Sequence, residues 1–350
     1  MPSVLIDIYK TNDPYSGLGQ FSFHYAKHIL RVKPEDYDLH FLGKRDPDIS
    51  ANSDVTFLPA NWQKRYLPSL NKRFDLWHSL HQFPSHRPAG NTLHILTIHD
   101  LNFLVEKNDK KAAKYLYRLN KNVKRADILT TISDYTKKQL FEHIDIKNKP
   151  VHTIYNGVEL PVAEHPAKPG YVDTQDFFFT IGIVTMKKNF HTLVPLMHSF
   201  PGMKLVIAGN NNTSYARQII DSLKVHKLEN RVILAGKISD EEKYWLYSNC
   251  RAFLFPSLAE GFGLPVIEAM LAGKPVFLSK HASLPEIGGR LAYYWDNFEP
   301  GHMAKVIKTN LNVFYKDQAA RSTELINYAQ KYSWKECIRK YLELYRDLLA

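Results

Sequence analysis

The chain has 350 residues, of which 44% are hydrophobic, and its formal net charge is +11. This length exceeds what one hydrophobic core usually serves, so two packed domains are expected rather than a disordered chain. Two cysteines, Cys250 and Cys337, are too few for a disulfide framework. No apolar stretch reaches the roughly 18 residues that span a membrane, and the start lacks a signal-peptide pattern. We therefore expect a reduced, cytoplasmic protein.

The 46 Lys and Arg against 35 Asp and Glu favour anionic partners such as phosphorylated small molecules, anionic lipid surfaces or nucleic acid. No zinc-finger, RRM or basic-zipper pattern is present, so nucleic acid is not expected as a partner. The basic and aromatic segment 62–74, WQKRYLPSLNKRF, would permit peripheral contact with the inner face of the cell membrane. An ordinary surface segment explains it equally well.

In the first half, short apolar runs alternate with amphipathic segments, which is typical of parallel sheets covered by helices. The expected strands are residues 4–9, 38–42, 75–78, 94–99, 128–133 and 151–155. Helical periodicity is clearest over 21–32 and 112–126. The stretch 156–175 has three prolines and two glycines without any period, which indicates an interdomain linker, placed at 161–175.

A second α/β series follows, with expected strands at 177–183, 204–209, 231–236, 252–256, 275–279 and 291–295. Ser239 with Glu242, and Ser333 with Glu336, have the spacing of capping boxes that begin helices. The sequence thus predicts an α/β protein with two doubly wound, Rossmann-like domains, 1–160 and 176–332, facing each other across a cleft. A final helix occupies 333–350. Ligands of such sheets bind beyond the carboxyl ends of the strands.

The first strand leads to Gly17 and Gly19, which form a G-x-G, but Ser22 stands where G-x-G-x-x-G needs its last glycine. This departure argues against a nicotinamide cofactor. The glycines could still bring a helix N-terminus close to an anion, or they could form a plain flexible turn.

The segment 260–268, EGFGLPVIE, places Glu260 before a helix that we expect to run from about Gly263 to Gly273, with Glu268 inside it. Free N–H groups in the first helical turn favour a phosphate. Carboxylates repel phosphate but accept hydrogen bonds from sugar hydroxyls. The combination favours a sugar nucleotide, although a helix start with well-placed acids would look similar.

Lys187 and Lys188, in VTMKKNF, follow the expected strand 177–183. Lysines beyond the carboxyl end of a strand can neutralise a diphosphate and stabilise the charge that develops as it leaves. Two solvated loop lysines are the alternative interpretation.

Together these segments resemble the retaining glycosyltransferases of family GT4, which have the GT-B fold. The resemblance is carried by PSLAEGFGLPVIEAMLAGKPV (256–276) with its E-x7-E pattern, IGIVTMKKN (181–189), ASLPEIGG (282–289), TIHD (97–100), TISDYTKK (131–138), IYNGVE (154–159) and SGLGQF (16–21). The matches follow the family order over nearly the whole chain.

The resemblance implies a catalytic set of Glu260, His99 and Lys188. Glu268 would hold the ribose hydroxyls, while Glu260 would meet the transferred sugar. The implied donor-binding residues are Lys187, Lys188, Gly182, Gly261, Phe262, Gly263, Leu264 and Glu268. The implied residues near the acceptor and cleft are Gly17, Gly19, His99 and Asp100. Family members often carry an arginine where this chain has Ile183, which leaves one phosphate contact in doubt.

The implied reaction is the transfer of a hexose, with retention, from GDP-mannose or a UDP-sugar to a glycan or lipid-linked acceptor hydroxyl. It needs no metal and no further cofactor. In this family the last helix typically packs back on the first domain. Two alternatives stay open: a nucleotide-sugar epimerase of the same fold, and a non-catalytic protein that binds nucleotide sugars or glycans.

Overall fold

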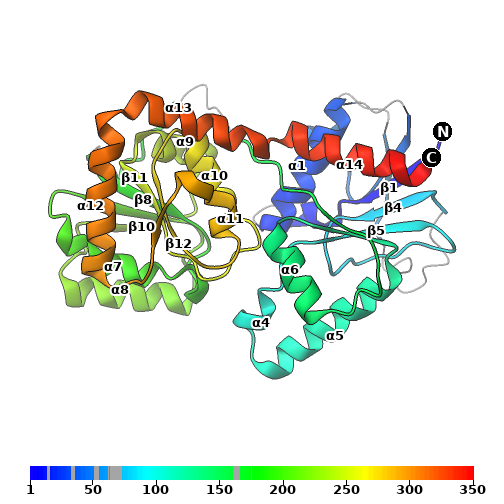
Figure 1. The fold of residues 1–350 in the computed structure, drawn as a ribbon, viewed down its shortest axis with the longest axis horizontal. Coiled ribbons are helices and arrows are strands. Elements are labelled where there is room, and N and C mark those ends of the chain that lie inside the picture. The colour runs from blue at the N-terminus through cyan, green and yellow to red at the C-terminus, as the bar shows by residue number, and fades with distance from the viewer. Residues whose placement is uncertain are drawn as a thin grey trace. The chain divides into compact units, whose positions relative to one another are not determined.

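The computed structural model describes residues 1–13, 16–32, 36–50, 55–61, 63, 73–160, 166–174 and 176–350 (Figure 1). The chain divides into two compact units. Unit 1 comprises Met1–Gly157 and Tyr332–Ala350, and unit 2 comprises Val158–Lys331. Most of the basic segment 62–74, and residues 161–165 and 175 of the expected linker, lie outside the described residues.

Unit 1 is built on a seven-stranded sheet in the order β3-β2-β1-β4-β5-β6-β7. Its strands are β1 (Ser3–Asp7), β2 (Asp38–Leu42), β3 (Thr56–Leu58), β4 (Leu76–Ser79), β5 (Leu93–Ile98), β6 (Ile128–Thr131) and β7 (Val151–Thr153). All their pairings are parallel. The six strands expected in this half are present, and β3 is an addition. The strand order reverses beside β1, which is where doubly wound sheets bind ligands.

The helices of unit 1 lie on both faces of this sheet. They are α1 (Gly17–Val32), α2 (Pro47–Ser50), α4 (Phe103–Glu106), α5 (Asp109–Arg125), α6 (Asp134–His143) and α14 (Trp334–Leu349), with a short 3-10 helix η1 (Tyr9–Asn12). One buried cluster joins α1 and α14 to the strands, and another joins α5 and α6 to them. Figure 1 shows α14 and α5 on opposite sides of the sheet. The last helix is therefore part of the core of unit 1.

The interpretation of Gly17 and Gly19 as a plain flexible turn before the helix is wrong, because α1 already begins at Gly17. A Cβ atom at Gly19 would lie only 1.9 Å from the backbone oxygen of Asp13. Glycine is needed there because the preceding turn passes against the helix, and not because the chain must bend freely.

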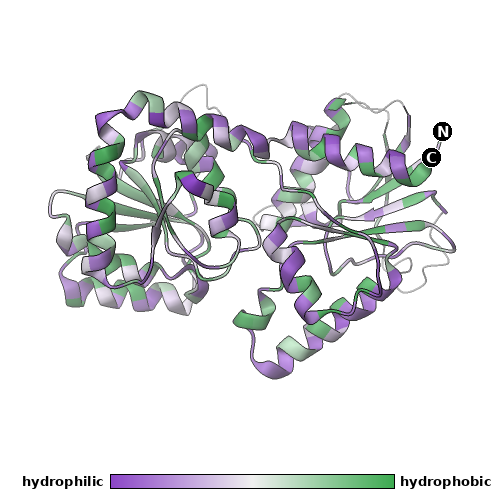
Figure 2. Cartoon of the chain, viewed as in Figure 1, coloured by the Kyte–Doolittle hydropathy of each residue, from purple (hydrophilic) through white to green (hydrophobic). Residues whose placement is uncertain are grey.

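Unit 2 is built on a six-stranded parallel sheet in the order β10-β9-β8-β11-β12-β13. Its strands are β8 (Phe177–Ile181), β9 (Lys204–Ala208), β10 (Val232–Gly236), β11 (Ala252–Phe255), β12 (Val276–Ser279) and β13 (Tyr293–Trp295). All six match the expected runs. Figure 2 shows their apolar character beneath helices that carry hydrophilic residues on the outside.

The helices of unit 2 are α7 (Leu193–Leu196), α8 (Ser214–His226), α9 (Asp240–Asn249), α10 (Leu264–Leu271), α11 (Leu284–Gly288), α12 (Pro300–Lys316) and α13 (Gln318–Ala329). Short 3-10 helices include η3 (Met186–Lys188). Among the helices of the described residues, none has both the length and the apolar character to cross a bilayer.

Of the two expected capping boxes, one forms completely and the other forms only in part. At α9, Ser239 and Glu242 bond to each other's backbone N–H groups, so this box is confirmed. At α14, Ser333 accepts from the Glu336 N–H, but the Glu336 carboxylate binds Arg339. An arginine three residues along the helix competes for that carboxylate, so the reciprocal half of the box does not form.

Candidate active site

The motifs of unit 2 converge because β8, β11 and β12 are parallel neighbours. Their carboxyl ends lie at one edge of the sheet. The loop after β8 carries Lys187 and Lys188, and the loop after β11 carries Glu260. The loop after β12 carries Ser283. Residues more than 90 positions apart in sequence therefore share one site.

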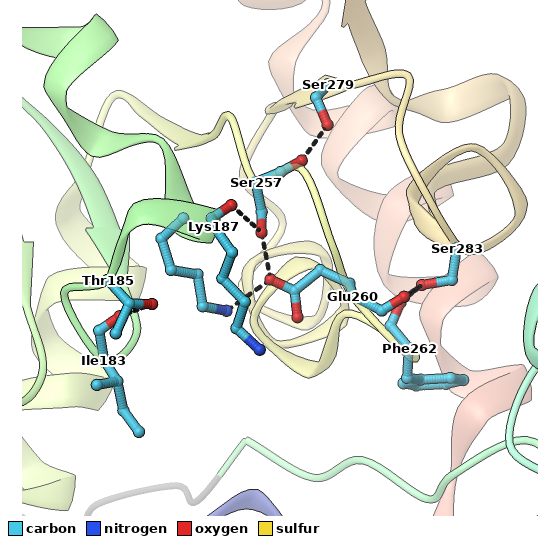
Figure 3. Close-up of polar contacts among 9 residues, drawn as sticks. Ile183, Thr185, Lys187, Ser257, Glu260, Phe262, Ser279 and Ser283 are labelled. Atoms are coloured by element: carbon cyan, nitrogen blue, oxygen red, sulfur yellow. Dashed lines mark hydrogen bonds and ion pairs between the residues drawn. The ribbon is translucent and has the colours of Figure 1, made fainter. Parts of the chain in front are cut away.

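Glu260 is held through one of its two oxygens. Lys188 Nζ and Ser257 Oγ each lie 2.6 Å from Glu260 Oε1 (Figure 3). The lysine and glutamate side chains are only 11% and 12% exposed, and Lys188 Nζ also lies 4.7 Å from the centre of the Phe255 ring. Glu260 Oε2 accepts no hydrogen bond from the described residues. A nearly buried carboxylate thus offers one whole oxygen to a ligand.

Three serines outside the predicted set shape the loop that carries Glu260. Ser283 Oγ lies 3.0 Å from the Glu260 carbonyl oxygen and 2.7 Å from that of Phe262 (Figure 3). Ser257 Oγ also lies 3.2 Å from the Lys187 carbonyl oxygen, and Ser279 Oγ donates to the Ser257 carbonyl. These bonds fix the backbone that positions the carboxylate. Ser257 and Ser283 lie inside the motifs 256–276 and 282–289, so a signal for them was present in the sequence.

Glycines make the close approach of these loops possible. Gly182 has φ 154° and Gly263 has φ 115°, both in the region that favours glycine. A Cβ atom at Gly182 would lie 2.9 Å from Lys188 Cε, so this glycine leaves room for the lysine. Gly263 is the N-cap of α10, which has Pro265 in its first turn as the sequence predicts.

Glu268, on α10, is held by donors to both of its oxygens. Lys243 Nζ lies 2.6 Å from Oε1, and the Tyr247 hydroxyl lies 2.7 Å from Oε2. Burial disfavours the charged form of Lys243, but the Glu268 carboxylate outweighs this effect and raises the pKa of the lysine. Burial and the same carboxylate raise the pKa of Tyr247 well above its usual value, so its hydroxyl stays a donor.

Lys243 and Tyr247 were not among the predicted site residues. Both come from α9, some 20 residues before Glu268, and no local pattern links that helix to the E-x7-E segment. A carboxylate oxygen can accept about two hydrogen bonds. Each oxygen of Glu268 therefore keeps capacity for one more donor.

The remaining predicted residues of unit 2 surround this edge. Ile183 is 48% exposed, so an apolar side chain stands where the family often has an arginine. The Phe262 side chain is 3% exposed, which leaves only its backbone to contact a ligand. Gly261 is buried, while Leu264 and Lys187 are partly exposed.

Four predicted residues lie in unit 1 and form a separate group. His99 follows β5 and is 6% exposed, and its Nε2 lies 2.7 Å from the Leu80 carbonyl oxygen. Burial lowers the pKa of His99 to about 4, so the ring is neutral at pH 7. Because Nε2 donates to a carbonyl, Nδ1 carries the lone pair and can accept from a hydroxyl. The ring also contacts Phe21 of α1, which brings the helix of Gly17 and Gly19 close to it.

Asp100 and a second buried acid complete this edge of unit 1. The Asp100 side chain accepts from the Asn102 N–H at 3.0 Å, which fixes the turn after β5. Asp7, at the end of β1, is 1% exposed, and burial raises its pKa to about 7. Its Oδ2 has no hydrogen-bond partner among the described residues. Asp7 was not among the predicted residues, because an acid within an apolar run gives no separate signal.

Two family models match the chain. The model described as glycosyl transferases group 1 matches residues 162–332, and the model described as glycosyltransferase family 4 matches residues 29–161. The first range holds the whole sheet of unit 2, and the second holds every strand of the unit 1 sheet except β1.

Several curated relatives are named as mannosyltransferases, at low identity. The serotype-specific mannosyltransferase WbdA of Escherichia coli is 25% identical over 275 residues, covering 73% of this chain and 33% of the relative. The O-antigen chain mannosyltransferase B of Escherichia coli is 24% identical over 271 residues, covering 73% and 70%. The chain spans about a third of the length of the WbdA relatives that it matches.

Solved structures with the same architecture cover almost the whole chain. Sucrose-phosphate synthase from Thermosynechococcus elongatus has a TM-score of 0.77 at 18% identity, with 99% of both chains covered. Anabaena HepE in complex with UDP-glucose has a TM-score of 0.76 at 15% identity, with 99% of this chain and 100% of HepE covered.

The two parallel sheets and the site at the edge of unit 2 define a protein of the GT-B fold, with two Rossmann-like domains. The chain belongs to the GT4 family of glycosyltransferases. The resemblance predicted from the E-x7-E segment and its companion motifs is confirmed.

Proposed function

We propose that the chain transfers a hexose, with retention of configuration, from a nucleotide-diphosphate sugar to a hydroxyl of a glycan or lipid-linked acceptor. One observation carries the proposal. Glu260 is nearly buried, both of its protein donors meet Oε1, and Oε2 stays available beside a lysine and a helix N-terminus. This arrangement suits a ligand that combines sugar hydroxyls with a diphosphate.

Unit 2 would hold the donor at three points. Lys188 and Lys187 would neutralise the diphosphate together with N–H groups around Gly263. Glu260 Oε2 would accept hydrogen bonds from the hexose. The two half-occupied oxygens of Glu268 would accept the vicinal hydroxyls of the ribose.

The reaction needs no covalent intermediate on the protein. The bond between the anomeric carbon and the diphosphate oxygen breaks while the acceptor oxygen attacks from the same face. The acceptor proton passes to the departing phosphate oxygen. Positive charge develops on the sugar ring in this scheme, and the Glu260 carboxylate stabilises it, while the lysine ammoniums stabilise the leaving diphosphate. Because these groups supply the positive charge, we propose that no metal is required.

His99 would act on the sugar or on the acceptor. Its neutral ring offers Nδ1 as an acceptor for a hydroxyl, because Nε2 is bound to the Leu80 carbonyl. Asp100 and the start of α1 would line the same region of unit 1.

GDP-mannose is the first candidate donor, because relatives of this chain are named as mannosyltransferases. A UDP-sugar is the alternative, since the structural neighbour HepE was solved with UDP-glucose. The relatives named for O-antigen chains favour a polysaccharide acceptor. We also propose that the chain works on the cytoplasmic side of a membrane, at its surface.

The test is incubation of the protein with GDP-mannose or UDP-hexoses, with and without glycan and lipid-linked acceptors. Release of nucleoside diphosphate that depends on an acceptor supports transfer. An isomerised nucleotide sugar without acceptor would identify an epimerase, and binding with neither reaction would identify a non-catalytic protein. The anomeric configuration of the product, read by NMR, tests retention.

A further inference from the structure

A pocket of about 940 Å³ lies in unit 1 at the carboxyl ends of β1 and β2 and beside β3. It is lined by Tyr9, Asn12, Gly43, Lys44, Arg45 and Phe57, among others. The three strands are parallel neighbours, so the pocket opens at the edge where doubly wound sheets bind ligands. Its volume is in the range of about 300–1,000 Å³ that is usual for small-molecule sites.

The charged side chains that line this pocket are both basic. Lys44 and Arg45 come directly after Gly43 at the end of β2, and both are exposed. The described lining contains no Asp or Glu. A guanidinium group fits a phosphate or a carboxylate through two parallel hydrogen bonds, and a neighbouring ammonium adds a second charge. The pocket therefore favours a ligand with an anionic group.

Two aromatic rings give the same pocket an apolar surface. Tyr9 and Phe57 both line it, and both are partly exposed. The Tyr9 N–H donates to Asp7 Oδ1 at 3.0 Å, and the Tyr9 ring meets the His86 ring edge to face, with 5.8 Å between the ring centres. Because both its backbone and its ring are held, Tyr9 presents a fixed surface. Such a surface suits the apolar C–H face of a sugar ring.

The loops that form the pocket are fixed by hydrogen bonds. Asn12 Nδ2 donates to the Tyr9 carbonyl oxygen at 2.8 Å, which leaves Asn12 Oδ1 as an acceptor for a hydroxyl. The Gly43 N–H donates to the Leu58 carbonyl oxygen at 3.1 Å. A Cβ atom at Gly43 would lie 2.9 Å from Ile8 Cγ1, so glycine lets the loop after β2 pass close to β1. The site is thus formed before a ligand arrives.

The lining groups together select one class of ligand. An inorganic anion would use only Lys44 and Arg45. A neutral sugar would use only the aromatic rings and the Asn12 amide. A sugar that carries a phosphate or a carboxylate would use all of them.

We propose that this pocket binds an anionic saccharide, whose phosphate or carboxylate pairs with Lys44 and Arg45 while its ring packs on Tyr9. The inference rests on the proposed function, because it makes this saccharide part of the acceptor. It narrows the acceptor from any glycan to one that carries an acidic or phosphorylated unit.

The experiment measures binding of three probes to the full chain by saturation-transfer NMR: mannose 6-phosphate, methyl β-glucuronide and neutral methyl α-mannoside. GDP and UDP are kept in excess so that the donor site of unit 2 is occupied. At least one anionic probe should bind about tenfold more tightly than the neutral one, because hydrogen bonds to charged groups are the stronger ones. Tighter binding of the phosphate probe identifies a phosphorylated saccharide, and tighter binding of the glucuronide identifies an acidic sugar. Equal binding of all three, or no binding of either anionic probe, would overturn the proposal.

Lys44→Gln combined with Arg45→Gln should abolish the preference for the anionic probes and leave binding of methyl α-mannoside unchanged. The matched control is Lys110→Gln with Lys111→Gln on α5. These lysines are also adjacent and exposed in unit 1, and the net charge changes by the same amount. The control should bind all probes like the wild type, and circular dichroism should show both variants folded. Equal losses in the two double variants would mean that net charge alone attracts the probes, which would overturn the proposal.

Tyr9→Leu tests the sugar-binding surface separately from the charges. It should weaken binding of all three probes about threefold to tenfold, because the aromatic contact is lost. Inorganic phosphate should bind this variant and the wild type equally, and more weakly than mannose 6-phosphate. If inorganic phosphate binds the wild type as tightly as mannose 6-phosphate does, the pocket is an anion site and not a saccharide site.

A kinetic measurement separates this inference from the proposed transfer. With an acidic or phosphorylated glycan as acceptor, Lys44→Gln combined with Arg45→Gln should raise the acceptor KM about tenfold and leave kcat nearly unchanged. Transfer with an unchanged acceptor KM would overturn the pocket assignment and leave the proposed function intact. Probe binding in the expected order without transfer to any acceptor would count against the transfer alone.

Discussion

The carboxylates of Glu260 and Glu268 each meet one lysine and one hydroxyl, but the donors are distributed differently. At Glu260, Lys188 and Ser257 both bind Oε1. At Glu268, Lys243 binds Oε1 and Tyr247 binds Oε2. One oxygen of Glu260 is therefore wholly available to a ligand. Each oxygen of Glu268 can accept one further hydrogen bond.

We propose that this difference serves two kinds of ligand recognition by the same residue type. A single available oxygen can follow a sugar hydroxyl whose position changes as the ring flattens during transfer. Two half-occupied oxygens held by two anchors form a rigid pair, which fits two hydroxyls on neighbouring carbons. The spacing of the E-x7-E pattern brings the two glutamates to one edge of the unit 2 sheet. The hydrogen-bond donors from other elements then determine which carboxylate oxygens stay available.

The largest expected effect comes from removing the lysine of the first pair. Lys188→Met leaves the Glu260 charge nearly buried with only Ser257 as a donor. The free energy of unfolding should fall by about 3–5 kcal/mol, measured by urea titration. Lys188→Met combined with Glu260→Gln should recover most of this loss, because no buried charge then stands alone. A single variant as stable as the wild type would show that the pair is not desolvated.

Glu260→Gln should lower kcat/KM for transfer about a hundredfold. The amide cannot stabilise positive charge on the sugar, and one such contact in a dry site is worth about 3 kcal/mol. Steady-state kinetics with the donor identified by the incubation experiment measure this effect. Nucleoside diphosphate affinity, by calorimetry, serves as the control and should change little. Near-normal turnover would remove Glu260 from the catalytic set.

Lys243→Met tests whether its two donors hold the Glu268 carboxylate in one orientation. Without its lysine the carboxylate can rotate, so the preference for a ribonucleotide over its 2′-deoxy form should fall about tenfold, or about 1.4 kcal/mol. Calorimetry with GDP or UDP and the matching deoxynucleotide gives the ratio. Lys224→Met, at an exposed position on α8, is the control. Equal losses for both nucleotides would mean that Lys243 acts on charge alone.

Tyr247→Phe should have a smaller effect in the same direction. It removes one neutral donor to Glu268, which is worth about 0.5–1.5 kcal/mol. We expect nucleoside diphosphate binding about threefold to tenfold weaker in the same titration. If the affinity is unaltered, Lys243 alone positions the carboxylate.

Chelation should have no effect at all on transfer. The diphosphate is expected to meet lysines and backbone amides, so a full titration with EDTA should leave the rate unchanged. A rate that falls and returns with Mg²⁺ would contradict this part of the proposal.

Much of this site could be predicted from the sequence because its parts lie at strand ends. The apolar runs 177–183 and 252–256 locate β8 and β11, and the polar residues that follow them must meet at one edge. That geometry predicts that Lys188 and Glu260 lie near each other, whereas their ion pair is a finding of the structure. The anchors of Glu268 could not be predicted, because α9 contributes them across the packing of helices, which no local spacing encodes.

Other differences between the predicted and the observed fold have local causes. β3 has only three residues and gives too short a pattern to recognise. Gly17 and Gly19 indicate a loop by composition, but contact with the preceding turn requires a glycine inside the helix. Periodicity alone does not indicate which sheet α14 packs against, since an amphipathic helix can cover either one.

The place of α14 has a consequence for how the protein is made. Its residues Ile338, Tyr341 and Tyr345 are fully buried among those of α1, β1 and β4, although all of unit 2 lies between them in the chain. On the ribosome, unit 2 is continuous and can fold as soon as it emerges. Unit 1, synthesised first, stays open on one face until the final helix arrives. A nonsense codon near residue 333 would therefore damage the half of the protein that was translated earliest.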